Sequence, residues 1–548
     1  MSNPRQAPAP ASPRPRDGRG SPPARGRPAV WLSGFRPFYL LGPAYLAWLL
    51  LVGAAAATGL VVAGPGTLPL PAGAALWHAH EMLYGFAMAI VAGTVLAALP
   101  SWAHTPELHG RSLVVLAALW GAGRLAFHAI GWAQSSLALV VVALLDSALV
   151  LVLLLRLAPQ LLRGTDRRFA LLLPVLAGLA AANLAFHAAL AAHDAARAMT
   201  ALRALLWLIV VLYSLVGGVL TPIFTGNVLA ARGRGVQAPF SPPLEAAALL
   251  TLVALAIADL ASAPPPCVAA LACTALVTQL WRTTRWRGWR AADDALVAGM
   301  NLGFAWLIVA LALRAAAALG APLPEAAWVH AFTMGALGTM MLALMTRVAL
   351  RHTGRPPLAP PALRWLLALA SAATLLRILS TPLGLGAPAM ALAATAWGGC
   401  LIAWWAAHAR MLLAPSLPRP AAGGAGSGTP TIPRPSPPGR GRLRGGSPIL
   451  SSPPSDPAAG TPGNAPLERE LAELFVEALN LETPAAELDI TAPLFGDGLG
   501  LDSIDILEVA LAISQRYGFQ LRSDDEHNVR IFRSIRSLAA HVAQHRVK

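Results

Sequence analysis

Long apolar segments constrain the fold of this chain more than any other feature. Runs of roughly 18 or more apolar residues, the length of a helix that crosses a bilayer, recur about twelve times before Pro415. Only 12% of the residues are charged, against roughly 25% in an average soluble domain. Because a backbone inside lipid must satisfy its own hydrogen bonds, we expect an all-α, polytopic bundle of about 12 transmembrane helices.

The distribution of arginine predicts the orientation, because short cytoplasmic loops hold more Lys and Arg than translocated loops. Arginine-rich loops alternate with arginine-poor loops, and residues 1–36 form a basic tail without the apolar core of a signal peptide. We expect this tail to be disordered, and both termini to be cytoplasmic. The loops assigned to the cytoplasm hold Arg111, Arg156, Arg163, Arg167, Arg168, Arg232, Arg234, Arg282, Arg285, Arg287, Arg290, Arg347, Arg351, Arg355 and Arg364.

Five histidines fall at the outer ends of four expected helices in this topology. They are His78, His80, His128, His187 and His330. Any one of them is explained by a membrane interface, where imidazole bonds to headgroups and loop carbonyls. Together they favour a common site, because ionisable groups inside a membrane are costly and usually face the bundle interior. His78 and His80 lie about 200 degrees apart on an ideal helix and should face different neighbours.

Neutral imidazole is a common ligand for haem iron and also suits copper, so these five histidines are the candidate metal ligands. Arg124, one turn before His128, is a candidate to neutralise a haem propionate, or alternatively to pair with Glu81. A methionine stripe follows His330 and offers soft copper ligands, although ordinary core packing explains it better. The stripe consists of Met334, Met341 and Met345.

Four sequence blocks resemble those of the NnrS family, in the same order, over residues ~30–412. They read "GFRPFYL" from Gly34, "WHAHEMLYGFAMAIVAGTVL" from Trp77, "PIFTGN" from Pro222 and "HAFTMGALGTMMLALMTRVALRHTGRP" from His330. The resemblance implies a bacterial inner-membrane protein that binds haem and copper and is linked to denitrification or to nitric oxide and nitrosative stress. The positions it singles out are His78, His80, Glu81, His330, Arg347 and His352. The family pattern has a basic residue shortly before "PIFTGN", where Val219 stands in this chain.

The composition changes after the last apolar run. Residues 413–466 are rich in Pro, Gly and Ser and are typical of an extended linker. Residues 467–548 hold 14 acidic and 8 basic residues, a net charge of −6, while the rest of the chain carries +21. Contact with an anionic leaflet explains the basic excess without nucleic acid. The predicted domains are therefore the tail (1–36), the transmembrane domain (37–412), this linker and a soluble domain (467–548).

The soluble domain contains "GLGLDSIDILEV", with Asp502 and Ser503 at the start of a helix. Ser503 is explained by an ordinary helix N-cap, but the segment also resembles the acyl carrier proteins over the whole domain. The resemblance implies a small helix bundle whose Ser503 carries 4'-phosphopantetheine, attached by a phosphopantetheinyl transferase. Its acidic face is expected to bind acyl-transferring enzymes of the fatty acid or polyketide type.

The leading hypothesis is a fusion of an NnrS-like haem and copper membrane protein with an acyl carrier domain. The alternatives are a transporter for a lipid or polyketide-type product and a membrane-anchored carrier scaffold, neither with redox function. The sequence assigns no catalytic residue and does not decide whether the chain is an enzyme.

Overall fold

The structure is a computed structural model whose described residues form two helical cores. It describes residues 28–57, 73–103, 107–129, 135–163, 170–417, 465–479, 484–494, 499, 501, 509–510, 512–513, 516–518 and 531–545. These residues contain helices and no strand, which confirms the predicted all-α class. One hydrophobic core extends through the helices before residue 418 and a separate one through the helices after residue 464.

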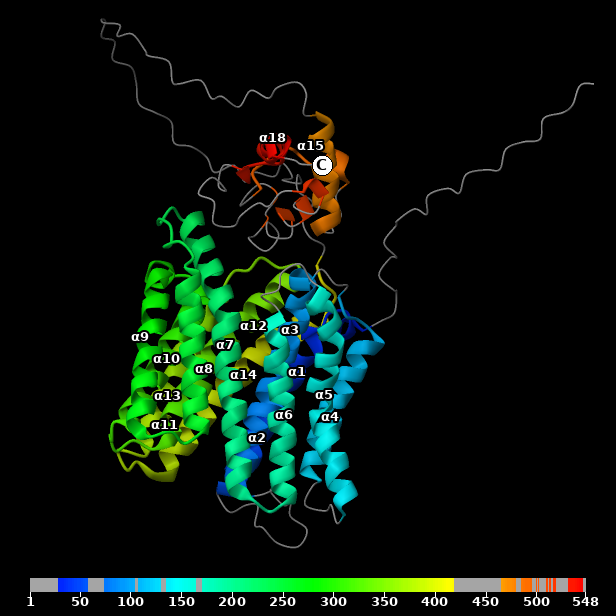
Figure 1. The fold of residues 1–548 in the computed structure, drawn as a ribbon. Coiled ribbons are helices and arrows are strands. Elements are labelled where there is room, and N and C mark those ends of the chain that lie inside the picture. Colours follow the sequence, from blue (N-terminus) through cyan, green and yellow to red (C-terminus); the bar gives the residue numbers. More distant parts are fainter. Residues whose placement is uncertain are drawn as a thin grey trace, which may run out of the picture.

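The large core is built by long, nearly parallel helices (Figure 1). In chain order they are α1 (Phe35–Ala57), α2 (Ala74–His80), η2 (Glu81–Ala87), α3 (Met88–Ala103), α4 (Arg111–His128), α5 (Ser136–Arg163), α6 (Leu172–Ala191), α7 (Ala195–Ala231), α8 (Pro242–Leu260), α9 (Pro265–Arg285), α10 (Ala295–Ala318), α11 (Glu325–His330), η6 (Ala331–Leu337), α12 (Gly338–His352), α13 (Ala362–Ser380) and α14 (Gly386–Leu413). Two short 3-10 turns, η1 (Ala29–Trp31) and η5 (Gly288–Ala291), precede α1 and α10.

Nine helical segments within the described ranges are long and apolar enough to cross a membrane. The chain is therefore a multi-pass membrane protein. Helices α1, α4 and α9 lie alongside these nine in the bundle (Figure 1). The expected count of about twelve passes stays a prediction. Large apolar side chains such as Leu125, Leu155 and Trp365 are exposed on the outside of the bundle, as expected for a surface that faces lipid.

Most helices pack against their neighbours in the sequence, and α14 returns to pack against α1. Residues of three helices, α3, α7 and α12, line an apolar pocket of about 80 Å³. The cavity lining includes Met340, Met341 and Met345 but no histidine. The methionines of the predicted stripe are buried, so core packing accounts for them.

Arg36 links the first and the last helix of the large core. Its guanidinium donates hydrogen bonds to the carbonyl oxygens of Leu412 (2.8 Å) and Ala414 (2.6 Å) and to Ser416 Oγ (2.9 Å). These are orphan acceptors at the C-terminus of α14, where a cation is favourable. The arginine of the "GFRPFYL" block thus has a structural role at the end of the bundle opposite the histidines.

Two spans are interrupted by a π-helical segment of seven residues, η2 between α2 and α3 and η6 between α11 and α12. Each segment offers a carbonyl to a tryptophan of another helix. Trp120 Nε1 donates to Gly85 O and Trp397 Nε1 donates to Met334 O, both at 3.0 Å. Such π-helical insertions often occur at functional sites.

The small core belongs to the soluble domain. It contains α15 (Ala465–Leu479), the 3-10 turn η7 (Ala485–Glu487) and α18 (Ile535–His545), which agrees with the predicted first and last helices. Leu471 and Phe475 of α15 are buried together with Ile535 and Leu538 of α18. Gly518 has a positive φ of 77°, as expected at the predicted C-terminus of the middle helix.

Candidate functional site

His80 is the last residue of α2 and is completely buried where the chain enters η2. Its ring stacks on Phe186 of α6, with centroids 4.6 Å apart, and lies 4.2 Å from Phe127 of α4. His78, two residues earlier, is exposed. The structure therefore places the two histidines in different surroundings, as their spacing predicts.

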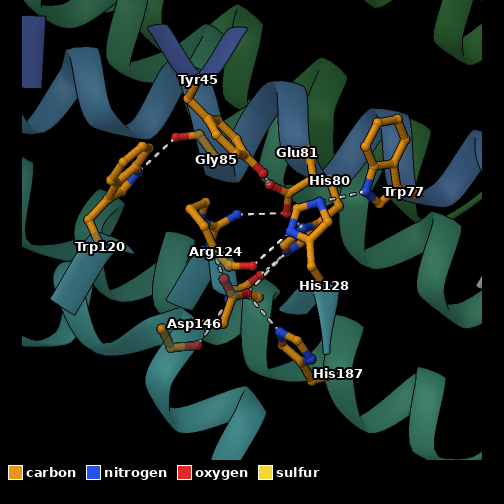
Figure 2. Close-up of polar contacts among 12 residues, drawn as sticks. Tyr45, Trp77, His80, Glu81, Gly85, Trp120, Arg124, His128, Asp146 and His187 are labelled. Carbon is orange, nitrogen blue, oxygen red and sulfur yellow. Dashed lines mark hydrogen bonds and ion pairs between the residues drawn. The ribbon is translucent and has the colours of Figure 1, made fainter. Parts of the chain in front are cut away.

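Both ring nitrogens of His80 face hydrogen-bond acceptors (Figure 2). Nδ1 lies 2.8 Å from Glu81 Oε1, and Nε2 lies 2.9 Å from Asn183 Oδ1 and 3.2 Å from Asp146 Oδ2. The Asn183 side chain is oriented by its amide nitrogen, which donates to Asp146 Oδ2 (2.8 Å) and Ser147 Oγ (3.0 Å). A cation at this ring, either a second proton or a metal ion, satisfies every one of these acceptors.

Arg124 of α4 lies between the two carboxylates of this cluster. Its Nη1 donates to Glu81 Oε1 (2.7 Å), and its Nη2 pairs with Asp146 Oδ1. Tyr45 of α1 donates to the other oxygen of Glu81. Of the two roles expected for Arg124, the structure contains the pairing with Glu81, and it adds Asp146 as a second partner.

Gly85 makes room for this arrangement. A Cβ atom at Gly85 would lie 2.7 Å from Glu81 Oε2 and 3.1 Å from Arg124 Nη1. The π-helical segment thus brings a residue without a side chain against the buried ion pair.

His187 of α6 is the remaining member of the cluster. Its Nε2 lies 2.7 Å from Asp146 Oδ2, and its ring centroid is 5.8 Å from that of His80. Within the described part of the chain, its Nδ1 is buried without a hydrogen-bond partner. Ligand atoms of His80, Asp146 and His187 all lie within 4.8 Å of one another, which is compatible with a shared metal ion.

His128 lies near this cluster, but its nitrogens are both engaged. Nε2 accepts a hydrogen bond from Trp77 Nε1 (3.2 Å), and Nδ1 lies 2.7 Å from Arg124 O. The ring also packs edge-on against Trp48, 4.8 Å between centroids. His128 therefore has a packing role in this structure and no free nitrogen for a ligand.

His330 and His78 form a second group that involves Arg377 of α13. Nδ1 of His330 donates to Ala326 O at 2.7 Å, the carbonyl one turn earlier, and this bond leaves Nε2 as the acceptor nitrogen. His78 and Arg377 both lie within electrostatic reach of His330. The five predicted histidines thus separate into the pair His80 and His187, the pair His78 and His330, and His128.

The other positions implied by the resemblance lie elsewhere. The Arg347 guanidinium lies over the Phe224 ring, 3.7 Å from its centroid, and the His352 ring lies 5.6 Å from Phe35 at the Arg36 end of the bundle. Near Val219, which is partly exposed, the buried guanidinium of Arg282 fills the space that a Cβ at Gly218 would occupy. A basic group is therefore present next to this block, but α9 supplies it.

Sequence reasoning missed Asp146 and Tyr45. Asp146 is the sole acidic residue of α5, in the run "VVVALLDSALVLVLLL", and this isolation was the available signal. Tyr45 gave no signal, because aromatic residues are common in transmembrane helices. Ser503 and Asp502 lie outside the described residues.

Comparison with known families matches two parts of the chain. The model of the NnrS protein family matches residues 29–416, and the model of the phosphopantetheine attachment site matches residues 469–542. No curated protein matches the chain.

Proposed function

We propose that this chain, which belongs to the NnrS family, holds haem and copper at the histidine end of its membrane bundle and acts in the response to nitric oxide or in denitrification. Its second part is an acyl carrier domain, for which we propose 4'-phosphopantetheine on Ser503. We further propose a bacterial inner-membrane location with both termini in the cytoplasm.

The observation that carries the proposal is the group of imidazoles at one end of the bundle. His80 and His187 are buried, with ring centroids 5.8 Å apart, and α11, which ends in His330, lies at the same end of the bundle as α2, which holds His78 (Figure 1). Buried ionisable groups are costly in a membrane protein and are usually retained for a binding role.

The pair His78 and His330 has the donor set that a haem needs. The Nδ1 bond of His330 fixes the ring and would leave Nε2 to bind haem iron, which is the arrangement found in most metal-binding histidines. Arg377, which forms no ion pair among the described residues, offers a cation for a propionate. A bound haem would supply redox chemistry and an iron that takes diatomic ligands. The chain's own residues would fix the ring and balance the charge.

If His78 and His330 hold haem, copper would require imidazole nitrogens from other histidines. His80 and His187 have the suitable ligand type, and their packing on Phe186 and Phe127 excludes water from the cluster. His128 does not fit as a ligand, because its Nε2 lone pair already accepts a hydrogen bond from Trp77 Nε1, whereas Nε2 of His80 faces acceptors.

The carrier domain supports a second activity. A serine at a helix N-terminus receives phosphate beside the positive end of the helix dipole, and the pantetheine thiol then holds acyl groups as thioesters. The partners would be a phosphopantetheinyl transferase and basic, acyl-handling enzymes of the fatty acid or polyketide type. No partner is identified by the residues described.

An absorption spectrum of the full-length protein in detergent tests the haem proposal. We expect a Soret band that is lost in His330→Ala and kept in His408→Ala. His408 is a matched control, because its Nδ1 also bonds to the carbonyl one turn earlier, Trp404 O at 2.8 Å, but at the other end of the bundle. Absence of a Soret band in haem-supplied wild-type protein would favour a membrane-anchored carrier scaffold.

Intact-mass spectrometry tests the carrier proposal independently. After treatment with a phosphopantetheinyl transferase, the wild-type chain should gain the mass of one phosphopantetheine group, and Ser503→Ala should gain none. Modification of Ser503→Ala would contradict the assignment of this serine.

A further inference from the structure

We propose that His80, Asp146 and His187 form a binding site for a single first-row transition-metal ion, held by His80 Nε2, Asp146 Oδ2 and His187 Nε2. The inference deepens the proposed function, because it names the residues and the class of ion of its non-haem metal. It does not depend on haem binding at the other histidine pair.

The ligand distances fit such an ion. Asp146 Oδ2 lies 3.2 Å from His80 Nε2 and 2.7 Å from His187 Nε2. Metal bonds of about 2.0–2.2 Å at ordinary coordination angles place neighbouring ligand atoms roughly 3 Å apart. All three ligand atoms lie within 4.8 Å of one another, so they can share one ion after side-chain movements. Two imidazoles and one carboxylate are a ligand set for transition metals, not for Ca²⁺ or Mg²⁺, which prefer oxygen.

The charge balance favours a cation. With neutral imidazoles, the cluster holds the carboxylates of Glu81 and Asp146 against the single guanidinium of Arg124, so one negative charge is unbalanced. All three groups are buried. Because charges interact strongly where water is excluded, an unbalanced carboxylate in this position attracts a cation.

The surrounding residues already orient the ligands. Glu81 Oε1 accepts from His80 Nδ1, which directs the Nε2 lone pair at Asp146, the pattern by which carboxylates orient metal-bound histidines. Asp146 is fixed by Asn183 and Arg124, each of which binds one of its oxygens. Glu81, Asn183 and Arg124 are therefore positioning residues for the site.

His187 carries the second observation that points to a ligand. Its imidazole is buried, and within the described ranges its only hydrogen bond is to Asp146. The unpartnered nitrogen is Nδ1, so the case for an ion rests on Nε2, which faces the same carboxylate oxygen as His80 Nε2. An ion at Nε2 would account for its presence in the cluster, because that nitrogen would then bind metal instead of donating to Asp146.

Cobalt binding to the full-length protein is the test. The protein is purified in detergent, freed of its affinity tag and treated with chelator, and Co²⁺ is measured by equilibrium dialysis and by its visible absorption. We expect one equivalent in the wild type. His187→Ala and Asp146→Asn should weaken binding by more than about 100-fold, since even loss of a positioning partner costs 10–100-fold.

Asp259→Asn is the matched control. Asp259 is also a buried carboxylate that pairs with an arginine, Arg314, and accepts from a ring nitrogen, Trp207 Nε1 at 2.8 Å. It has no histidine beside it among the described residues, so its variant should bind Co²⁺ like the wild type. His187→Ala keeps the ion pairs of Arg124, so it remains informative if Asp146→Asn does not fold.

The outcomes separate this inference from the proposed function. Wild-type affinity in both His187→Ala and Asp146→Asn would overturn the metal site. Failure of the wild-type protein to bind Co²⁺ would also overturn it and would mean that a proton balances the charge of the cluster. Loss of Co²⁺ in His330→Ala with retention in His187→Ala would move the site to the other histidine pair. A missing Soret band together with intact Co²⁺ binding would contradict the haem proposal alone.

Discussion

The two π-interrupted spans use the same backbone device in different chemical surroundings. In both, a histidine ends a short helix, seven π-helical residues follow, and a tryptophan indole bonds to a carbonyl of that segment. η2 itself begins with the carboxylate of Glu81, and its neighbours add a second carboxylate, an arginine and an asparagine. Around η6 they are largely apolar, and Gly335 packs against the Trp306 ring.

This difference shows that backbone geometry and site chemistry are set by separate residues. Each π-helical segment contains a glycine against which a neighbouring side chain packs closely. A tryptophan of another helix donates to a carbonyl that the wider π-helical turn leaves without a partner. The residues that decide what each histidine can bind come from Glu81 of η2 and the adjacent helices α4, α5 and α6 in one case, and from α13 in the other. The comparison predicts that matched substitutions will have unequal effects.

Replacing the arginine near each histidine should give the largest contrast. Arg124→Leu leaves Glu81 and Asp146 buried without a counter-charge, and we expect it to lower the free energy of unfolding by about 3–5 kcal/mol. Arg377→Leu, at a partly exposed residue, should change it by about 0.5 kcal/mol or less. Denaturant titration in mixed micelles measures both, and equal losses would contradict the contrast.

Adding a methyl group to each π-helical glycine should have a smaller effect on stability. Gly85→Ala and Gly335→Ala both place a Cβ within 2.7 Å of a buried group, and overpacking of this kind costs about 1–3 kcal/mol. Only Gly85→Ala should also weaken Co²⁺ binding, because its Cβ meets Glu81 Oε2. If Gly335→Ala weakens Co²⁺ binding as much, the two spans are not independent sites.

Glu81→Gln should act on the metal site more than on the haem site. It removes the charged acceptor that orients His80, and the loss of such a partner lowers metal affinity about 10–100-fold, or about 1.4–2.7 kcal/mol. The Soret band should not change. Cobalt dialysis and the absorption spectrum of the same sample measure both effects, and unchanged Co²⁺ affinity would remove Glu81 from its positioning role.

The tryptophan bonds should contribute least and equally. Trp120→Phe and Trp397→Phe each leave one π-helical carbonyl without its indole donor, which should cost about 1 kcal/mol in either span. Thermal unfolding in detergent compares the two variants. A clear difference between them would indicate that the backbone device is not shared.

The sequence predicted the helical class, which follows from the length of the apolar runs. That the five histidines face the non-cytoplasmic side, which follows from arginine bias, stays a prediction. The sequence did not predict the division of the histidines, which depends on how α2, α5 and α6 pack. Asp146 was missed because a single carboxylate in an apolar run does not identify its partners. The π-helical segments have no sequence period by which to recognise them.

X-ray absorption spectroscopy at the cobalt edge, on full-length protein loaded with one equivalent of Co²⁺, tests most directly whether the first π-interrupted span presents a metal site. The account predicts a first coordination shell with two imidazole nitrogens and at least one carboxylate oxygen, and loss of one imidazole in His187→Ala. A shell of oxygen ligands alone, or one unchanged in His187→Ala, would contradict it.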